Sequence, residues 1–371
     1  MTASHAAPLP ADIATLADYE RHAAAHIDPA TWAHIAQGTT HANRAAFGRW
    51  GLLPRPLAPI AQGSTARVLL GQRHDTPLLL APVAYHRLVH PAGEIATAQA
   101  AAAMGATLVA STLSSVTLED IAAATRAAAQ ELGLPVPPQW FQLYCQPDPD
   151  QTLALVRRAE DAGYGVLVVT VDAAIKRADF ALPPGIVAAN LVDPAVAAPA
   201  PHRAEAQAGP LVFGSALARQ APTWDTIAQL RQATSLPLVV KGLLHPDDAR
   251  AAREAGAEGI VVSNHAGRVL DGVAPALPCL PAVRAAVGPN YPVLFDGGVR
   301  SGADALKAMA LGADAVMVGL PQLHALAVGG VAGVAHMLHI LRTEFALAMA
   351  QCGCTDAGRI GPGLVMPMIG G

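Results

Sequence analysis

The chain has 371 residues, of which 52% are hydrophobic and 14% charged, and its formal net charge is −4 at pH 7. This composition excludes a disordered chain and supplies a large core, while the scattered lysines and arginines exclude a basic footprint for nucleic acid. Four cysteines without paired spacing exclude a cysteine zinc site and a disulfide scaffold, so we expect a reduced, cytoplasmic protein without a metal site. We expect neither a secretory signal nor a membrane span, because no run reaches the roughly 18 apolar residues that a span needs.

Residues 11–47 are predicted to be helical. Apolar positions recur at helical spacing through ADIATLADYERHAAAHI and through WAHIAQ, and the pattern is interrupted at Asp28-Pro29 and at Gly38. We therefore expect residues 1–60 to form a helical extension in front of the main fold.

From Leu78 onward, short apolar runs alternate with alanine-rich helical segments, which is typical of βα units on a parallel sheet. The eight predicted strands are residues 78–82, 107–110, 139–143, 166–172, 238–241, 260–264, 293–296 and 316–319. Eight alternations over about 250 residues match a TIM barrel. The alternative, a doubly wound open sheet, requires a glycine fingerprint after its first strand, where this chain has Pro82-Val83-Ala84. The sequence predicts an α/β fold, a (β/α)8 TIM barrel, with residues 1–371 as one domain.

Residues 186–221 interrupt the alternation after the fourth predicted strand. They are rich in Ala, Pro and Gly without a period, and so long a connection on this side of a barrel is typical of a mobile lid loop. A membrane contact is the alternative. It is disfavoured because the charges of the segment include glutamate and no clear amphipathic helix is present.

Polar residues, glycine or proline lie at the carboxyl end of nearly every predicted strand. In barrel enzymes the carboxyl ends of the strands carry the active site, and polar groups at the rim of an apolar core are costly unless they bind something. In chain order these residues are Pro82, Val83, Ala84, Ser111, Gln142, Tyr144, Thr170, Asp172, Lys241, Ser263, His265, Arg268, Asp296, Gly297, Gly298, Arg300 and Gly319.

The sixth predicted strand delivers a base and a fixed cation to this face. His265 can take a proton near neutral pH, and the Arg268 guanidinium can bind a carboxylate through two hydrogen bonds. Taken alone, such a pair can also be structural. Asp172 is predicted to orient His265 and stabilise its imidazolium; the alternative is a barrel-layer carboxylate that backbone groups satisfy.

The segment DGGVRSG after the seventh strand predicts a phosphate site. Two glycines free backbone N–H groups, Arg300 adds a cation, and a helix predicted over residues 303–311 begins there. Together with Gly319 this is the usual phosphate cradle of barrels; a plain tight turn is the alternative. Lys241 is expected between this cradle and His265, where a cation stabilises charge on a cofactor ring, unless it only forms a salt bridge with a neighbouring carboxylate.

The stretch SNHAGRVLDG resembles the SNHGGRQLD signature of the FMN-dependent α-hydroxy acid oxidases and dehydrogenases, the family of glycolate, lactate and mandelate oxidases. Other segments, among them STLSSVTLEDIA, WFQLYCQPD, LPLVVKGLLHPDDAR and FDGGVRSGADALKAMALGADAVMVG, resemble the family in order over roughly residues 18–355. The segment APVAYHRLVHP is most similar to mandelate-type members. The resemblance implies FMN as the cofactor, a 2-hydroxy acid as the substrate, and a homotetramer.

The resemblance also implies residue roles. His265 would remove a substrate proton as two electrons pass to flavin N5, Arg268 would hold the substrate carboxylate, and Tyr144 would hydrogen-bond the substrate. Asp172 would pair with His265, and Lys241 would lie near flavin N1 and O2. The residues assigned to the cofactor are Pro82, Val83, Ala84, Ser111, Gln142, Thr170, Lys241, Ser263, Asp296, Gly297, Gly298, Arg300 and Gly319. The alanine at position 84 is frequent in the family's oxidases and favours O2 as the electron acceptor.

Three departures from the family concern the site. His34 stands where many members have a tyrosine that touches the substrate carboxylate. Leu320 replaces a second phosphate arginine, which leaves Arg300 alone. The segment between Asp172 and Phe180 is shorter than in typical members, and Arg177 is its only candidate for another active-site arginine.

We therefore predict oxidation of an (S)-2-hydroxy acid to the 2-oxo acid, with an aryl or bulky side chain favoured over lactate. The alternative is the same fold and cofactor acting as a monooxygenase or decarboxylase, or on a larger biosynthetic intermediate. A flavin-binding relative without catalysis is a third hypothesis. The joint presence of His265, Arg268, Lys241, Tyr144 and Asp172 argues against it.

Overall fold

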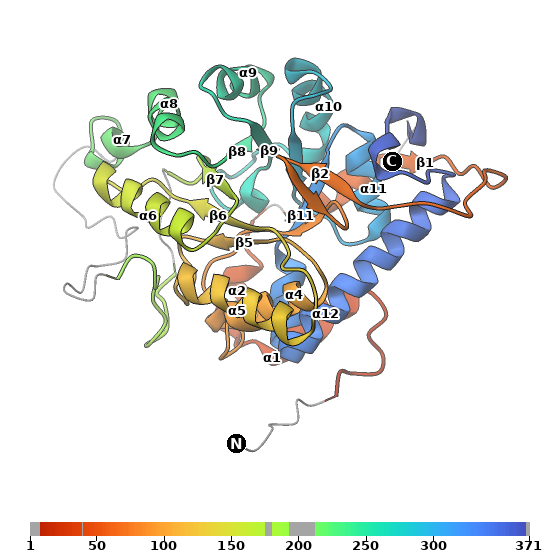
Figure 1. Cartoon of the computed structure of the whole chain (residues 1–371), viewed down its shortest axis with the longest axis horizontal. Helices are drawn as coiled ribbons and strands as arrows, with labels where there is room; N and C mark the ends of the chain where they lie inside the picture. The colour runs from red at the N-terminus through yellow and green to blue at the C-terminus, as the bar shows by residue number, and fades with distance from the viewer. Residues whose placement is uncertain (1–7, 39, 175–179, 193–211, 369–371) are drawn as a thin grey trace.

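A computed structural model describes residues 8–38, 40–174, 180–192 and 212–368. Eight parallel strands close into a barrel in the order β10-β11-β4-β5-β6-β7-β8-β9 (Figure 1). The strands are β4 Leu78–Leu80, β5 Leu108–Ser111, β6 Gln139–Leu143, β7 Val166–Thr170, β8 Leu238–Leu243, β9 Gly259–Val262, β10 Val293–Asp296 and β11 Ala315–Val318. The predicted (β/α)8 TIM barrel is confirmed.

Both faces of the barrel strands are buried, which explains their continuous apolar runs. Leu79 points into the barrel, while its neighbours Leu78 and Leu80 pack outward against the helices. The inward layer contains Leu79, Val109, Trp140, Val166, Val168, Val239, Val261, Leu294, Ala315 and Met317. A barrel filled in this way is a solid core, so a ligand can bind only at its ends.

Six of the eight predicted carboxyl ends differ from the structure by one or two residues, and three of these differences concern the site. The strand β7 stops at Thr170, so Asp172 lies in the loop beyond it, whereas β8 continues past Lys241 to Leu243. The strand β9 ends at Val262, before Ser263. The register of β8 against β9 shifts between Lys241 and Leu243, a bulge that strand propensity does not reveal.

Helices cover the outside of the barrel (Figure 1). They are α4 Glu94–Ala103, α5 Leu118–Glu131, α6 Pro149–Asp161, α8 Trp224–Ala233, α9 Pro246–Glu254, α10 Ala276–Val287, α11 Gly302–Ala310 and α12 Leu320–Gln351. Short 3-10 helices are η1 His86–Leu88, η2 His265–Gly267, η3 Ala357–Arg359 and η4 Pro362–Leu364. The helix α12 is long and apolar enough to cross a membrane, but 56% of its most apolar window is buried in the protein, as in a core helix.

The N-terminal extension contains α1 Leu16–His26, α2 Pro29–Ile35 and α3 Thr40–Phe47. Asp28 caps α2 by accepting from the backbone of Ala30 and Thr31, with Pro29 in the first turn. The predicted interruptions at Asp28-Pro29 and Gly38 are therefore confirmed.

The helical extension expected over residues 1–60 also contains a strand, which was not predicted. The strand β1 Trp50–Leu52 pairs antiparallel with β12 Val365–Pro367, and Figure 1 shows the C-terminus beside β1. A further hairpin, β2 Arg67–Leu69 with β3 Gln72–His74, was not predicted. Its Leu69 packs in the inward layer of the barrel and its Gln72 accepts a hydrogen bond from the Trp140 indole at 2.8 Å, so the hairpin covers the amino-terminal end of the barrel.

The predicted lid is partly a fixed segment. The Asn190 amide accepts from Leu118 N at 2.8 Å and donates to the carbonyls of Ser111 and Thr112, which anchors residues near 190 to the β5–α5 loop. The far end forms the short helix α7 Ala216–Gln220. Residues 193–211 lie outside the described residues, as does Arg177.

Candidate active site

A cavity of about 560 Å³ lies at the carboxyl ends of the barrel strands. It brings together predicted residues from all eight strand ends and one from the N-terminal extension. These are His34, Pro82, Val83, Ala84, Ser111, Gln142, Tyr144, Thr170, Lys241, His265, Arg268, Asp296, Gly297, Gly298, Arg300 and Gly319. Asp172 and Ser263 lie behind the cavity wall and act through His265 and Lys241.

His265 and Asp172 form a half-buried pair, with 2.9 Å between His265 Nδ1 and Asp172 Oδ1. Burial alone would raise the pKa of Asp172, but the hydrogen bond and charge of His265 and the charge of Lys241 outweigh it and lower that pKa. An ionised Asp172 accepts the Nδ1 proton, so Nε2 is the nitrogen left to take a proton.

Gly242 makes room for Asp172, a role that sequence reasoning missed. Gly242 has φ +111°, and a Cβ there would lie 2.4 Å from Asp172 Cγ. The bulge in β8 thus allows the carboxylate to approach the strand backbone. The sequence does contain a signal for this bulge: Gly242 directly follows the predicted strand 238–241, and a glycine in or beside a strand often marks a bulge.

The turn that carries His265 is built from left-handed residues. His265 has φ +53° and Ala266 has φ +56°. This left-handed conformation is energetically unfavourable for residues other than glycine. The α2–α3 connection packs on this turn: a Cβ at Gly38 would lie 2.2 Å from the Ala266 carbonyl oxygen. Asn264 and Asn43 of α3 exchange amide hydrogen bonds of 2.9 and 3.0 Å. The N-terminal extension therefore holds the base in place.

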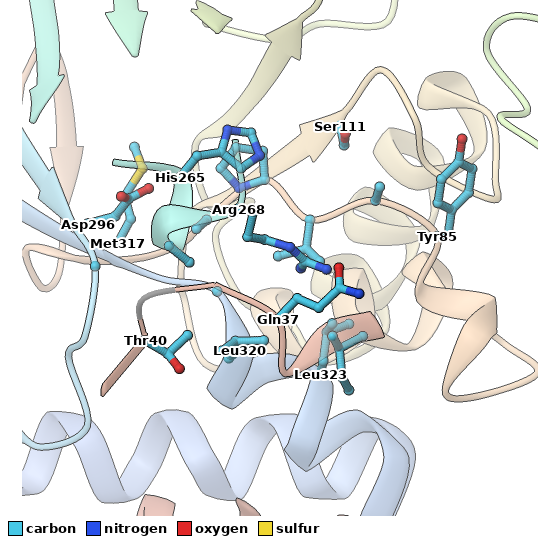
Figure 2. A pocket seen from close by; sticks show the side chains of 18 of the residues that line it. Gln37, Thr40, Tyr85, Ser111, His265, Arg268, Asp296, Met317, Leu320 and Leu323 are labelled. Carbon is cyan, nitrogen blue, oxygen red and sulfur yellow. The ribbon is translucent and has the colours of Figure 1, made fainter. Parts of the chain in front are cut away.

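Arg268 is a half-buried cation facing the same cavity. It donates to the main-chain carbonyl of His34, whose ring stacks on Phe180 at 4.1 Å and 16°. Burial lowers the pKa of Arg268, and the guanidinium still stays charged. Within the described ranges no carboxylate pairs with Arg268. Arg268 and His265 line the same cavity (Figure 2), so an anion bound to Arg268 would share that cavity with the base.

Lys241 lines the cavity and also forms a salt bridge, so it fits both predicted roles, a cation beside the cofactor and a partner of a neighbouring carboxylate. Its side chain is 5% exposed, forms an ion pair of 2.7 Å with Asp296 and donates to Ser263 Oγ at 2.9 Å. Burial would lower the pKa of Lys241, but the charges of Asp296 and Asp172 raise it. Asp296, assigned to the cofactor, is therefore also the counter-ion of a cation that lines the cavity.

The glycine cradle lies against the N-terminal extension. Gly297 and Gly298 have φ of +115° and +84°, and a Cβ at Gly298 would lie 2.6 Å from the Asn43 carbonyl carbon. Arg300 is 12% exposed and its Nε is 3.8 Å from Glu20 of α1. Neither Glu20 nor Asn43 was predicted, because both belong to a segment more than 250 residues away in sequence.

Several polar atoms of the cavity wall lack a hydrogen-bond partner in the part of the chain that the structure describes. Among them are Gln142 Nε2 and Thr170 Oγ1. Gln142 Oε1 accepts from Ser111 Oγ at 3.0 Å, which fixes the amide with its donor free. Buried polar atoms are normally satisfied, so both atoms indicate a polar ligand at this wall.

Residues 21–367 match the model of the FMN-dependent dehydrogenase family. The chain belongs to this family. It is similar to an L-lactate oxidase of Alicycliphilus denitrificans, with 50% identity over 93% of this chain and 94% of the relative. It is also similar to a 4-hydroxymandelate oxidase of Amycolatopsis orientalis, with 42% identity over 93% of this chain and 96% of the relative.

Solved structures agree with this assignment. A mandelate oxidase variant with (S)-mandelic acid has a TM-score of 0.83 at 39% identity, covering 97% of this chain and 99% of its own. A mandelate oxidase with benzoyl-formic acid has a TM-score of 0.82 at 39% identity, covering 96% and 99%. Both the fold and the family predicted from the sequence are confirmed.

The cavity fits FMN, the cofactor of this family. Gln142 and Thr170 offer free polar atoms to a polar ring edge, and Pro82, Val83 and Ala84 offer a wall along the cavity. At the other end, backbone at two left-handed glycines and the Arg300 cation suit a phosphate.

Proposed function

We propose that this FMN-dependent enzyme oxidises an (S)-2-hydroxy acid with an aryl or other bulky side chain to the 2-oxo acid, with O2 reoxidising the flavin. The observation that carries the proposal is that His265, paired with Asp172, shares one cavity with the residues that fit FMN and with Arg268, a half-buried cation to which no described carboxylate is paired. A base next to a carboxylate-binding cation is what the oxidation of a hydroxy acid requires.

The residues divide the reaction between them. Arg268 binds the substrate carboxylate and Tyr144 donates a hydrogen bond to the substrate, which orients the 2-hydroxy carbon toward His265. His265 Nε2 takes a substrate proton, and ionised Asp172 stabilises the imidazolium that forms. FMN, when bound, supplies the acceptor for two electrons. Lys241 keeps a positive charge in the cavity wall, which stabilises negative charge that develops there.

Apolar residues support a bulky substrate side chain. The lining includes Leu113, Phe180 and Leu182, and an apolar pocket binds a large apolar side chain more tightly than a methyl group. The relatives differ on this point, since one is named for lactate and another for 4-hydroxymandelate. Substrate choice therefore needs a direct measurement.

A substrate panel provides that measurement. The FMN-loaded protein is mixed anaerobically with glycolate, lactate, mandelate and 4-hydroxymandelate, and the loss of flavin absorbance is followed. We expect bleaching by all hydroxy acids that bind, fastest with the aryl acids, and recovery of colour on admission of air. Faster bleaching by lactate would refute the side-chain preference, and no bleaching would refute the activity. Product analysis after turnover in air tests the monooxygenase alternative, because oxidative decarboxylation needs O2: recovery of the 2-oxo acid excludes it, and recovery of a decarboxylated acid supports it.

Location and assembly stay predictions. We propose that the protein is cytoplasmic, which its cysteine usage supports, and that it is a homotetramer, which the family resemblance supports. Sedimentation of the purified protein measures its mass directly, and a value other than four chains of 37.9 kDa would refute the tetramer.

A further inference from the structure

Tyr85, in the loop after β4, adopts a backbone conformation that tyrosine rarely takes. Its φ and ψ are +55° and +56°, in the left-handed region, which is unfavourable for a non-glycine residue and persists only where the surroundings enforce it. Tyr85 N donates to the Leu113 carbonyl at 3.1 Å, so the loop after β4 is tied to the loop after β5. The side chain of Tyr85 lines the cavity.

The buried carboxylate of Glu94, the first residue of α4, supplies the rest of this restraint. Glu94 is 3% exposed. Its Oε1 accepts from His86 N at 3.0 Å, from Ser115 N at 2.8 Å and from Ser115 Oγ at 3.3 Å. Ser115 Oγ in turn accepts from Arg87 N at 3.1 Å. One carboxylate oxygen thus fixes the residue directly after Tyr85 and joins the same two loops a second time.

These two loops form the part of the cavity away from the base. Tyr85 and Leu88 come from the first loop and Leu113 from the second. In Figure 2 Tyr85 lies well apart from His265 and Arg268. If the substrate carboxylate is at Arg268, a long side chain reaches toward Tyr85 and a methyl group does not. Glu94 touches none of the reacting groups, so it can act only through Tyr85 and its neighbours.

We propose that Glu94 is a positioning residue for substrate selection: its carboxylate holds Tyr85 in the left-handed conformation, which places the phenol as the wall that receives the substrate side chain. This inference rests on the proposed function and deepens it, because it names the contact that separates bulky from small 2-hydroxy acids.

The test uses binding rather than turnover. Pyruvate and benzoyl-formic acid, 2-oxo acids with a small and a bulky side chain, are titrated into the oxidised holoenzyme, and dissociation constants are read from the change in flavin absorbance. We expect Glu94→Ala to raise the ratio of the benzoyl-formic acid constant to the pyruvate constant by about 2- to 150-fold, the range of coupling between residues of one hydrogen-bond network. Glu94→Gln keeps one neutral acceptor oxygen and is expected to shift the ratio less, in the same direction.

A double-mutant cycle separates positioning from general damage. In a Tyr85→Ala background the Glu94 substitutions are expected to leave the ratio unchanged, because the residue through which they act is gone. The control is Glu258→Gln. The Glu258 carboxylate also accepts a hydrogen bond from a backbone amide, that of Leu238, but it lies at the opposite end of the barrel. It is expected to leave the ratio at its wild-type value.

Each result supports or overturns the inference. Equal ratios in wild type and both Glu94 variants, or a shift that persists without the Tyr85 side chain, would overturn it. If Glu94→Ala yields no holoenzyme, the Glu94→Gln variant and its double-mutant cycle decide between the two outcomes. A wild type that binds both 2-oxo acids but is reduced by no hydroxy acid refutes the proposed function alone, and a wild type that binds neither refutes the inference as well.

Discussion

Asp172 is a half-buried carboxylate whose negative charge orients His265. Its side chain is 15% exposed, and its pKa lies below the ordinary 3.8, because the contacts with His265 and Lys241 outweigh burial. A carboxyl whose pKa is lowered on folding stabilises the fold when ionised, and this contribution is lost as the pH falls through the lowered pKa.

The first prediction follows from the lowered pKa of Asp172 in the folded protein. The advantage in free energy of unfolding that wild type has over Asp172→Asn should be present at about pH 5 and should be lost as the pH falls from 3.8 through the lowered pKa of the folded protein. Urea unfolding at a series of pH values measures it. A difference that grows on acidification would show that Asp172 is protonated in the folded protein.

The second prediction concerns Gly242. An added Cβ meets Asp172 Cγ at 2.4 Å, so Gly242→Ala should push the carboxylate from His265 and slow anaerobic flavin reduction by about 10²- to 10⁴-fold, the usual contribution of a positioned base. The matched control is Gly71→Ala, at φ +76° with nothing within 4 Å of its Cβ. It should lower stability by about 1–2 kcal/mol and leave flavin reduction unchanged. Equal effects of the two substitutions would contradict the role of the bulge.

At the scale of elements, the loop after β10 and the start of α11 form the end of the cavity that suits a phosphate. Arg300 lines it, and Leu320, the first residue of α12, occupies the neighbouring wall. Since Arg268 lies with the base at the other end of the site, Arg300 is the cation available to a phosphate among the lining residues described there.

The third prediction tests this end by cofactor binding. Arg300→Gln should weaken FMN binding about 10- to 100-fold, because hydrogen bonds to charged groups contribute about 1.5–3 kcal/mol, and Leu320→Arg should tighten it. Quenching of FMN fluorescence by apoprotein gives the constants. Arg359→Gln, at a side chain that is 86% exposed, is the control. Unchanged affinity in Arg300→Gln would place the phosphate elsewhere.

At the scale of the whole molecule, the inward layer of side chains keeps the eight strands together. Trp140 is fully buried in this layer. Its removal leaves a cavity in a core that has no space to collapse.

The fourth prediction measures that packing. Trp140→Ala should lower the free energy of unfolding by about 3–5 kcal/mol, whereas Trp224→Ala, at a side chain 36% exposed, should lower it by less than about 1 kcal/mol. Urea unfolding of both variants provides the comparison. A small loss in Trp140→Ala would mean that the barrel interior is loosely packed.

The barrel could be predicted from the sequence because its signals are local. Each strand is a continuous apolar run between turn residues, and each strand end carries its own polar residue. The pairing of β1 with β12, the β8 bulge at Gly242 and the carboxylate of Glu94 depend instead on contacts between distant segments. The same holds for Glu20 and Asn43 against the glycine cradle, which no local periodicity can indicate.

Anaerobic reduction of the flavin by (S)-mandelate, in wild type and in His265→Ala, tests most directly whether His265 is the base. We predict that both proteins bind FMN and are yellow, that wild type bleaches, and that the variant bleaches about 10²- to 10⁴-fold more slowly because it lacks the base. Undiminished bleaching of His265→Ala would contradict the assignment of His265 and the mechanism built on it.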